Sequence, residues 1–275
     1  MDDRYEEIEQ VNGKSQKKAN ELGGAEWTRY SISIWNDIRK TKDELKLKHP
    51  AMFPTMLTTR LIRCFTTDKD NCILDPFMGS GSTLISAISM GKQGIGFEIN
   101  KEYISLAEKR CSQVPIFEQY VKPRIYAETA TNITKRLPIE SVHLCVTSPP
   151  YWDILSQKRT ADMKDIRNYG DNEEDLANIR DYGEFLNGLI DVFKQVHSVL
   201  MPDKYCIVNV MDIRKKNIFY PFHSDLAIKM QEIGFIFDDV IIWDRRQEYN
   251  NLRSLGYPYV FRLNKIHEYL LIFKK

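Results

Sequence analysis

The chain has 275 residues, and its 43% of hydrophobic residues is enough apolar material for a large folded core, which argues against disorder throughout. Its 39 basic and 38 acidic residues give a net charge of +1, so the overall charge excludes no class of partner and selects none. No apolar run approaches the ~18 residues of a membrane span, and the acidic first ten residues are unlike a secretory signal, so we expect no membrane segment.

The five cysteines are scattered along the chain and lack the paired spacing of zinc sites or disulfide frameworks. Isolated thiols are typical of proteins in a reducing cytoplasm, where we expect this protein to be located. The sequence therefore predicts neither a structural metal nor a disulfide bond.

Residues 1–48 are predicted to form an N-terminal extension, which is polar at first and then contains several aromatic residues. Residues 49–275 are predicted to form a single domain, in which short apolar runs alternate with amphipathic stretches. The predicted helices are 53–65, 82–91, 102–114, 183–201 and 223–235. The predicted strands are 71–77, 94–100, 124–130, 141–150, 205–213, 236–243 and 267–275.

The alternation of strands and helices predicts an α/β fold with a seven-stranded, mostly parallel sheet that helices cover on both faces. The last two strands follow each other without an intervening helix, so we expect one antiparallel strand near the C-terminus.

A glycine-rich turn, DPFMGSGS (75–82), follows the first predicted strand and opens a helix. Gly79 and Gly81 allow the backbone to turn sharply and to lie close to a ligand. A dinucleotide fingerprint would need glycine where the chain has Leu84, and the phosphate-binding pattern GxxxxGK[ST] is absent. A nucleoside without a pyrophosphate, such as S-adenosylmethionine, therefore fits best, with Asp75 facing its amino group and Glu98 its ribose hydroxyls. The alternative is that the glycines only turn the chain.

A second turn, TSPPYW (147–152), ends the fourth predicted strand. Consecutive prolines have no N–H group, so we expect their carbonyl groups to project outward beside the hydroxyl group of Ser148. These acceptors would bind both protons of an exocyclic amine and aim its lone pair at a methyl sulfonium, while Tyr151 would stack on a base. The alternative is a rigid loop with a capping aromatic residue.

These two turns, with GFEIN (96–100) and HPAMFP (49–54), resemble the amino-methyltransferases of DNA over roughly residues 26–275. Enzymes of this family, which belongs to the superfamily that depends on S-adenosyl-L-methionine (AdoMet), methylate cytosine-N4 or adenine-N6, often in restriction–modification systems. The resemblance implies a Rossmann-like methyltransferase fold. The catalytic residues that it implies are Ser148, Pro149, Pro150 and Tyr151, and we refer to TSPPYW (147–152) as the catalytic turn. The implied cofactor-binding residues are His49, Pro50, Phe53, Pro54, Asp75, Pro76, Phe77, Gly79, Ser80, Gly81, Glu98 and Ile99.

The chain departs from many relatives with an SPPY turn in two respects. The glycine-rich turn comes before the catalytic turn, an order that a circular permutation would produce, and no large recognition domain is visible. Methylation at cytosine-C5 is disfavoured, because none of the cysteines follows a proline as its nucleophile would.

Serine before the two prolines is more usual among the cytosine-N4 enzymes of the family, so we favour this target over adenine-N6. A base inside a duplex cannot reach such a pocket, which implies base flipping. The resemblance implies double-stranded DNA with a short specific target and a cognate restriction endonuclease as partners, and it leaves a homodimer open. An RNA methyltransferase and a non-catalytic module that binds AdoMet or nucleic acid remain alternatives.

Two insertions, 153–181 and 245–265, are candidate DNA-contacting segments. The first directly follows the catalytic turn, as a substrate loop would. The second holds five basic residues, one acidic residue and interleaved aromatic residues, a mixture that suits phosphate contact and base stacking, although a solvated loop is the alternative. The residues predicted to contact DNA are Trp152, Lys158, Arg159, Arg245, Arg246, Arg253, Tyr257 and Arg262.

Overall fold

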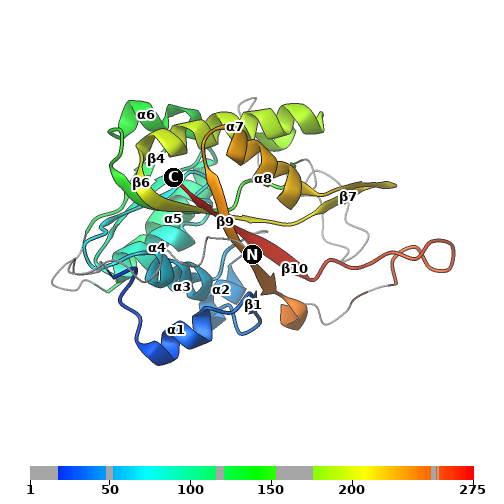
Figure 1. Ribbon diagram of the computed structural model, residues 1–275, viewed down its shortest axis with the longest axis horizontal. Helices are drawn as coiled ribbons and strands as arrows, with labels where there is room; N and C mark the ends of the chain where they lie inside the picture. Colours follow the sequence, from blue (N-terminus) through cyan, green and yellow to red (C-terminus); the bar gives the residue numbers. More distant parts are fainter. Residues whose placement is uncertain (1–17, 48–51, 116–120, 153–175, 249–251, 253) are drawn as a thin grey trace, which may run out of the picture.

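The computed structural model describes residues 18–47, 52–115, 121–152, 176–248, 252 and 254–275. An eight-stranded sheet forms its centre, in the order β1-β9-β10-β6-β5-β2-β3-β4 (Figure 1). The strands of this sheet are β1 (Ile34–Trp35), β2 (Cys72–Asp75), β3 (Gln93–Phe97), β4 (Arg124–Tyr126), β5 (Val142–Thr147), β6 (Leu200–Val210), β9 (Ile236–Asp244) and β10 (His267–Lys274). Strands β7 (Ile213–Lys215) and β8 (Ile218–Tyr220) form a separate antiparallel hairpin.

Neighbouring strands are parallel everywhere except at β10, which is antiparallel to both β6 and β9. The predicted α/β fold, with a mostly parallel sheet and one antiparallel strand near the C-terminus, is therefore confirmed. The prediction of seven strands is corrected to eight by β1. Its two residues pair with Ile242 and Trp243, and such a short element forms through this long-range pairing, which local sequence does not reveal.

Helices cover both faces of the sheet (Figure 1). The helices are α1 (Gly24–Tyr30), α2 (Lys42–Lys46), α3 (Thr55–Phe65), α4 (Ser82–Ser89), α5 (Lys101–Ser112), α6 (Ile133–Arg136), α7 (Tyr182–Val199) and α8 (Phe222–Glu232). Consecutive strand residues alternate between the two faces. Leu74, for example, belongs to the core beneath α7 and α8, whereas Ile73 belongs to the core beneath α3.

The order of the strands determines where a ligand can bind. From β2 the chain runs outward through β3 to β4 and then returns to β5 on the other side of β2. The direction of winding reverses between β2 and β5, and ligands of open α/β sheets bind at the carboxyl ends of the strands at such a point. Two of the predicted turns directly follow these two strands.

The described part of the predicted N-terminal extension packs against the sheet. Trp35 and Ile38 are buried in the core beneath α3. The guanidinium of Arg60, which is also buried, donates two hydrogen bonds of 2.7 and 2.9 Å to the carboxylate of Asp37. A charged pair of which one partner is buried fixes relative position strongly, so these residues are part of the folded unit.

All five cysteines carry free thiols. Within the described ranges, no three His, Cys, Asp or Glu side chains gather as a metal site would require. No helix in the same part of the chain is both long enough and apolar enough to cross a membrane.

Candidate active site

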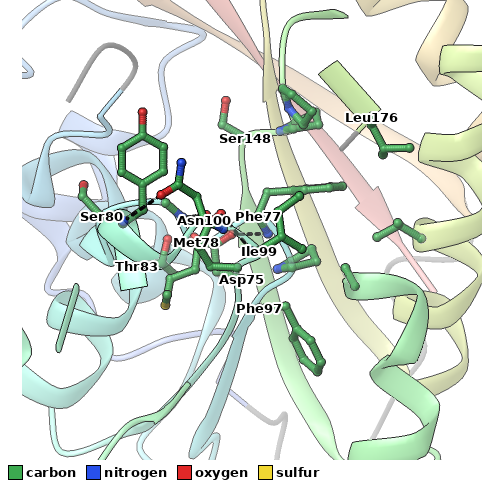
Figure 2. A pocket seen from close by; sticks show the side chains of 18 of the residues that line it. Asp75, Phe77, Met78, Ser80, Thr83, Phe97, Ile99, Asn100, Ser148 and Leu176 are labelled. Atoms are coloured by element: carbon green, nitrogen blue, oxygen red, sulfur yellow. Dashed lines mark hydrogen bonds between the residues drawn. The ribbon is translucent and has the colours of Figure 1, made fainter. Parts of the chain in front are cut away.

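A pocket of about 320 Å³ lies at the carboxyl ends of β2, β3, β4 and β5 (Figure 2). The segments that follow these strands supply most of its lining, namely residues 75–80, 97–100, 128–131 and 148–151. The other lining residues are Met52, Phe53, Ser82, Thr83, Tyr103, Leu176 and Val192. The volume is that of a site for a small molecule or cofactor. The glycine-rich turn and the catalytic turn, which are separate in sequence, thus line the same pocket.

A buried hydrogen bond joins these two turns. The hydroxyl group of Thr147, at the end of β5, donates to Oδ1 of Asp75, at the end of β2, over 2.6 Å. The same oxygen accepts from the backbone N–H of Phe77 over 3.1 Å. Burial raises the pKa of the Asp75 carboxyl group to about 6, although the hydrogen bonds that it accepts oppose this rise.

The shifted pKa of Asp75 predicts a specific dependence of stability on pH. The carboxyl group has a higher pKa in the folded state than its ordinary value of 3.8, so its contribution is most favourable below pH 3.8 and is lost as the pH rises through about 6. Between these limits the loss approaches about 3 kcal/mol. Urea unfolding of the ligand-free protein and of Asp75→Asn across this range should show the wild type losing stability relative to the variant. Parallel profiles would contradict the shift.

Glu98 organises the glycine-rich turn from the next strand. One of its carboxylate oxygens accepts from the N–H of Gly79 over 2.9 Å, and the other accepts from the N–H groups of Ile99 and Asn100. Gly79 has a φ of 51°, which lies in the left-handed region that favours glycine. A carboxylate is a pure acceptor with about four lone-pair sites in all, so Glu98 is also a group of the type that accepts from hydroxyl groups of a ligand.

Arg110 holds the same turn from outside the pocket. Its guanidinium is buried and donates to the carbonyl group of Ser80 over 2.6 Å and to the hydroxyl group of Ser82 over 3.2 Å. It also lies 3.6 Å from the carboxylate of Glu44 in α2. Helix α5 and the N-terminal segment therefore both fix the position of the turn.

Several residues that were predicted to bind the cofactor are not among those that line the pocket. Gly81 does not line the pocket. Its φ is 80°, and a β-carbon at this position would lie 2.9 Å from the Cβ of Ala107, so glycine is required here for close packing on α5. Pro54 precedes α3 and also does not line the pocket, whereas Phe53 does. His49 and Pro50 lie outside the described residues.

Ser148 lines the pocket at the end of β5 (Figure 2). Its hydroxyl group lies 3.2 Å from the carbonyl oxygen of Asn209 and 3.4 Å from the hydroxyl oxygen of Tyr151. When the single proton of Ser148 is donated to either of these oxygens, the lone pairs of its oxygen can accept from an N–H group in the pocket.

Tyr151 also lines the pocket, but its ring is largely buried, at 6% exposure, which limits the stacking surface that we expected. Its hydroxyl group donates to Oε2 of Glu268 over 2.9 Å and accepts from the side-chain amide of Asn209 over 3.1 Å. Glu268 is 3% exposed and also accepts from the side chains of Asn209 and Arg245. We refer to Ser148, Tyr151, Asn209, Glu268 and Arg245 as the catalytic-turn network.

Sequence reasoning missed Asn209 and Glu268. Asn209 is a single polar residue in an otherwise apolar stretch of β6, and Glu268 is the only acidic residue of β10, a central strand. An isolated polar residue at such a position requires a buried partner, and this is the signal that would have found them. Their partners come from distant parts of the chain, which the sequence pattern does not specify.

Trp152 and Arg245 were predicted to contact DNA, and the structure does not support this prediction. Trp152 is 3% exposed, donates from its indole nitrogen to the carbonyl group of Ile179, and packs against Tyr182 and Tyr220. The guanidinium of Arg245 is engaged by two carboxylates, those of Glu268 and Glu248. Both side chains are used within the protein.

The remaining predicted DNA contacts differ in their surroundings. Arg246 is exposed and pairs with Asp244, and Tyr257 is 81% exposed. Arg262 contacts the β7–β8 hairpin through Lys216 and Asn217. Lys158, Arg159 and Arg253 lie outside the described residues.

Comparison with known proteins identifies one family. Residues 2–109 and 142–275 match the profile of the family N6_N4_Mtase, described as DNA methylase. The chain is 40% identical over 93 residues to the type II methyltransferase M.BglI of Bacillus subtilis, and this alignment covers 33% of this chain and 25% of that protein. It is 31% identical over 122 residues to the type II methyltransferase M2.MboI of Moraxella bovis, and this alignment covers 44% of this chain and 40% of that protein.

Among solved structures, the protein TTHA0409 of Thermus thermophilus in complex with S-adenosyl-L-methionine is 27% identical, with a TM-score of 0.38. That comparison covers 53% of this chain and 52% of the other. The alignments with these three proteins span between a quarter and about half of their lengths.

Proposed function

This chain belongs to the N6_N4_Mtase family of DNA methylases, and from that premise we propose that it transfers a methyl group from AdoMet to an exocyclic amino group of a base in duplex DNA. The observation that carries the proposal is the hydrogen bond between Thr147 and Asp75. It joins the two turns whose residues resemble the cofactor-binding and catalytic motifs of the family, so both line one pocket.

The pocket suits AdoMet in size and in chemistry. A carboxylate at Asp75 complements a cationic amino group, and Glu98 can accept from ribose hydroxyls, while Phe97 and Ile99 offer apolar surface. The backbone at Gly79 has no side chain in the way of a ligand. When bound, the cofactor supplies an electrophilic methyl group. Phe53, Pro76, Phe77 and Ser80 complete the proposed binding residues.

The catalytic turn would position the target amine. The Ser148 oxygen and the carbonyl groups of Pro149 and Pro150 would accept its two N–H groups, which directs the nitrogen lone pair away from the turn and toward the methyl group. No covalent intermediate with the protein is needed, so catalysis consists of orientation and electrostatic stabilisation. The base must leave the duplex to reach the pocket.

We propose cytosine-N4 as the target in preference to adenine-N6, because serine precedes the two prolines of the turn. The relatives M.BglI and M2.MboI are named type II methyltransferases, which supports a restriction–modification role with a cognate endonuclease that recognises the same site. We further propose that residues 49–275, together with the N-terminal residues that pack on them, act as one catalytic domain in the cytoplasm.

Identification of the methylated nucleoside tests the proposal. The purified protein is incubated with isotope-labelled AdoMet and mixed-sequence duplex DNA, and the DNA is digested for mass spectrometry. We expect N4-methylcytosine. N6-methyladenine would retain the enzyme class and replace the base. Label in RNA but not in DNA would identify an RNA methyltransferase, and AdoMet binding without transfer to either would identify a binding module.

A further inference from the structure

Two segments outside the pocket emerge from the same edge of the sheet as the pocket. Strand β6 runs parallel to β5, and the β7–β8 hairpin follows its carboxyl end. Strand β10 is antiparallel to β6 and β9, so the connection from β9 to β10 lies at this edge too. Figure 1 shows the hairpin and residues 254–265 extending from one side of the molecule.

Contacts of Arg262 join the two segments into one unit. Its guanidinium donates over 2.7 Å to the carbonyl group of Lys216 and over 2.7 Å to the side chain of Asn217, both at the tip of the hairpin. The ammonium group of Lys265 lies 4.8 Å from the ring centre of Phe219 in β8. We refer to residues 213–220 and 254–265 together as the hairpin–loop arm.

The arm is basic and aromatic, and it contains no acidic residue in either of its two ranges. Its cations are Arg214, Lys215, Lys216, Arg262 and Lys265. Three of its aromatic side chains are almost fully exposed, namely Tyr257 at 81%, Tyr259 at 90% and Phe261 at 93%. A further apolar side chain, that of Leu263, is 66% exposed. Monomeric proteins rarely expose large apolar side chains so close together without a binding function.

The arm lies against Trp152, the last residue of the catalytic turn. The ring of Tyr220 in β8 is 5.1 Å from the ring of Trp152, measured between centroids, and the ammonium group of Lys215 is 4.0 Å from the Trp152 ring centre. Trp152 directly follows Tyr151, which lines the pocket. A polymer bound along the arm would therefore pass close to the pocket.

We propose that the hairpin–loop arm is the surface that contacts the duplex beside the target base, with its cations on phosphates and its exposed aromatic residues on bases. This inference rests on the proposed function and adds the recognition surface to it. Charge complementarity favours DNA as the occupant. The arm carries Lys and Arg side chains with no Asp or Glu among them, and such a surface attracts the negatively charged phosphates of DNA. The same charges would repel those of an identical arm, which disfavours a second copy of the chain. Arg262 acts as the link between the two segments.

Fluorescence anisotropy with labelled mixed-sequence duplexes tests the proposal at several salt concentrations. The double variant Arg214→Ala/Lys216→Ala should bind about 10-fold or more weakly, and the slope of log affinity against log salt should fall by about 1.8, which is about 0.9 for each lost phosphate contact. The matched control is Lys109→Ala/Lys135→Ala, which removes two exposed lysines from α5 and α6, far from the arm (Figure 1). The control should retain wild-type affinity.

The aromatic residues need a different readout. The double variant Tyr259→Ala/Phe261→Ala should weaken binding by about 10-fold with an unchanged salt slope, because stacking involves no counterion release. Its control is Ile139→Ala, which removes a side chain that is 62% exposed and precedes the opposite end of β5. Calorimetric binding of AdoMet should be unchanged in every variant, which verifies that each remains folded.

The outcomes separate this proposal from the proposed function. If the wild type methylates DNA and both arm variants retain its affinity and Michaelis constant for DNA, the arm assignment is wrong and the methyltransferase assignment stands. If the wild type neither binds nor methylates duplex DNA, both fall. If Tyr259→Ala/Phe261→Ala instead halves the molar mass measured by light scattering, the exposed residues form a subunit interface and the arm proposal is overturned.

Discussion

Replacement of Ser148 by alanine is expected to lower kcat for methyl transfer by about 100-fold or more, which is the usual cost of removing one hydrogen-bonding group that acts in the transition state. The hydroxyl group of Ser148 is a side-chain acceptor directly before two residues that lack N–H groups. Its removal leaves the target amine with one acceptor fewer, so the nitrogen lone pair is less well aligned with the methyl group.

The substitution should leave the binding of AdoMet within about twofold of wild type, because the residues proposed to bind the cofactor lie mainly on β2, β3 and their turns. Single-turnover kinetics and calorimetry separate these two effects. Ser141→Ala is the matched control. Ser141 precedes β5 at its opposite end and donates to the carbonyl group of Pro138 over 2.7 Å, so its loss should not change the rate. Equal rates for wild type and Ser148→Ala would remove Ser148 from the mechanism.

Replacement of Glu268 by alanine is expected to lower the free energy of unfolding by about 2–4 kcal/mol. Its side chain is 5% exposed, and its carboxylate accepts hydrogen bonds from Tyr151, Asn209 and Arg245. Removal of this carboxylate takes away the acceptor of three buried hydrogen bonds and one of the two carboxylates that neutralise Arg245, and these losses account for the cost. The 19% exposure of the Arg245 side chain keeps the expected cost below that of a fully buried pair.

Urea unfolding measures this cost, and Glu248→Ala supplies its control. Glu248 binds the same guanidinium over 2.7 Å but is 25% exposed, so its removal should cost less than about 1 kcal/mol. Glu268→Gln preserves the shape of the side chain and loses the charge, and we expect an intermediate loss. If Glu268→Ala and Glu248→Ala were equally stable, the network would have no special role in holding Tyr151.

The sequence predicted the elements that depend on local pattern. Alternating strands and helices follow from hydrophobic periodicity, and the two turns are visible because glycine and proline restrict backbone conformation in known ways. Asp75 and Ser148 line one pocket because strand order brings the ends of β2 and β5 together. That these two strands are neighbours agrees with the doubly wound, Rossmann-like fold that the resemblance implied.

Side-chain direction could not be predicted in the same way. Trp152, the last residue of the catalytic turn, was predicted to contact nucleic acid beside Tyr151, but packing against Tyr182 and Tyr220 places it in the core. Gly81 was predicted to contact a ligand, but it is required for packing on Ala107. In both cases the deciding partner lies more than twenty positions away in the chain, and no local signal identifies it.

Strand β1 has a further consequence, which concerns association between molecules. A strand at the border of a sheet exposes unpaired backbone groups on which another chain can add. Near its carboxyl end, β9 is covered by β1 through Ile242 and Trp243. The opposite half of β9 contains the exposed residues Ile236 and Phe237 followed by Asp238 and Asp239, whose charges disfavour addition of a strand. The N-terminal segment thus contributes to the solubility of the protein, because it covers the part of β9 that such charges do not protect.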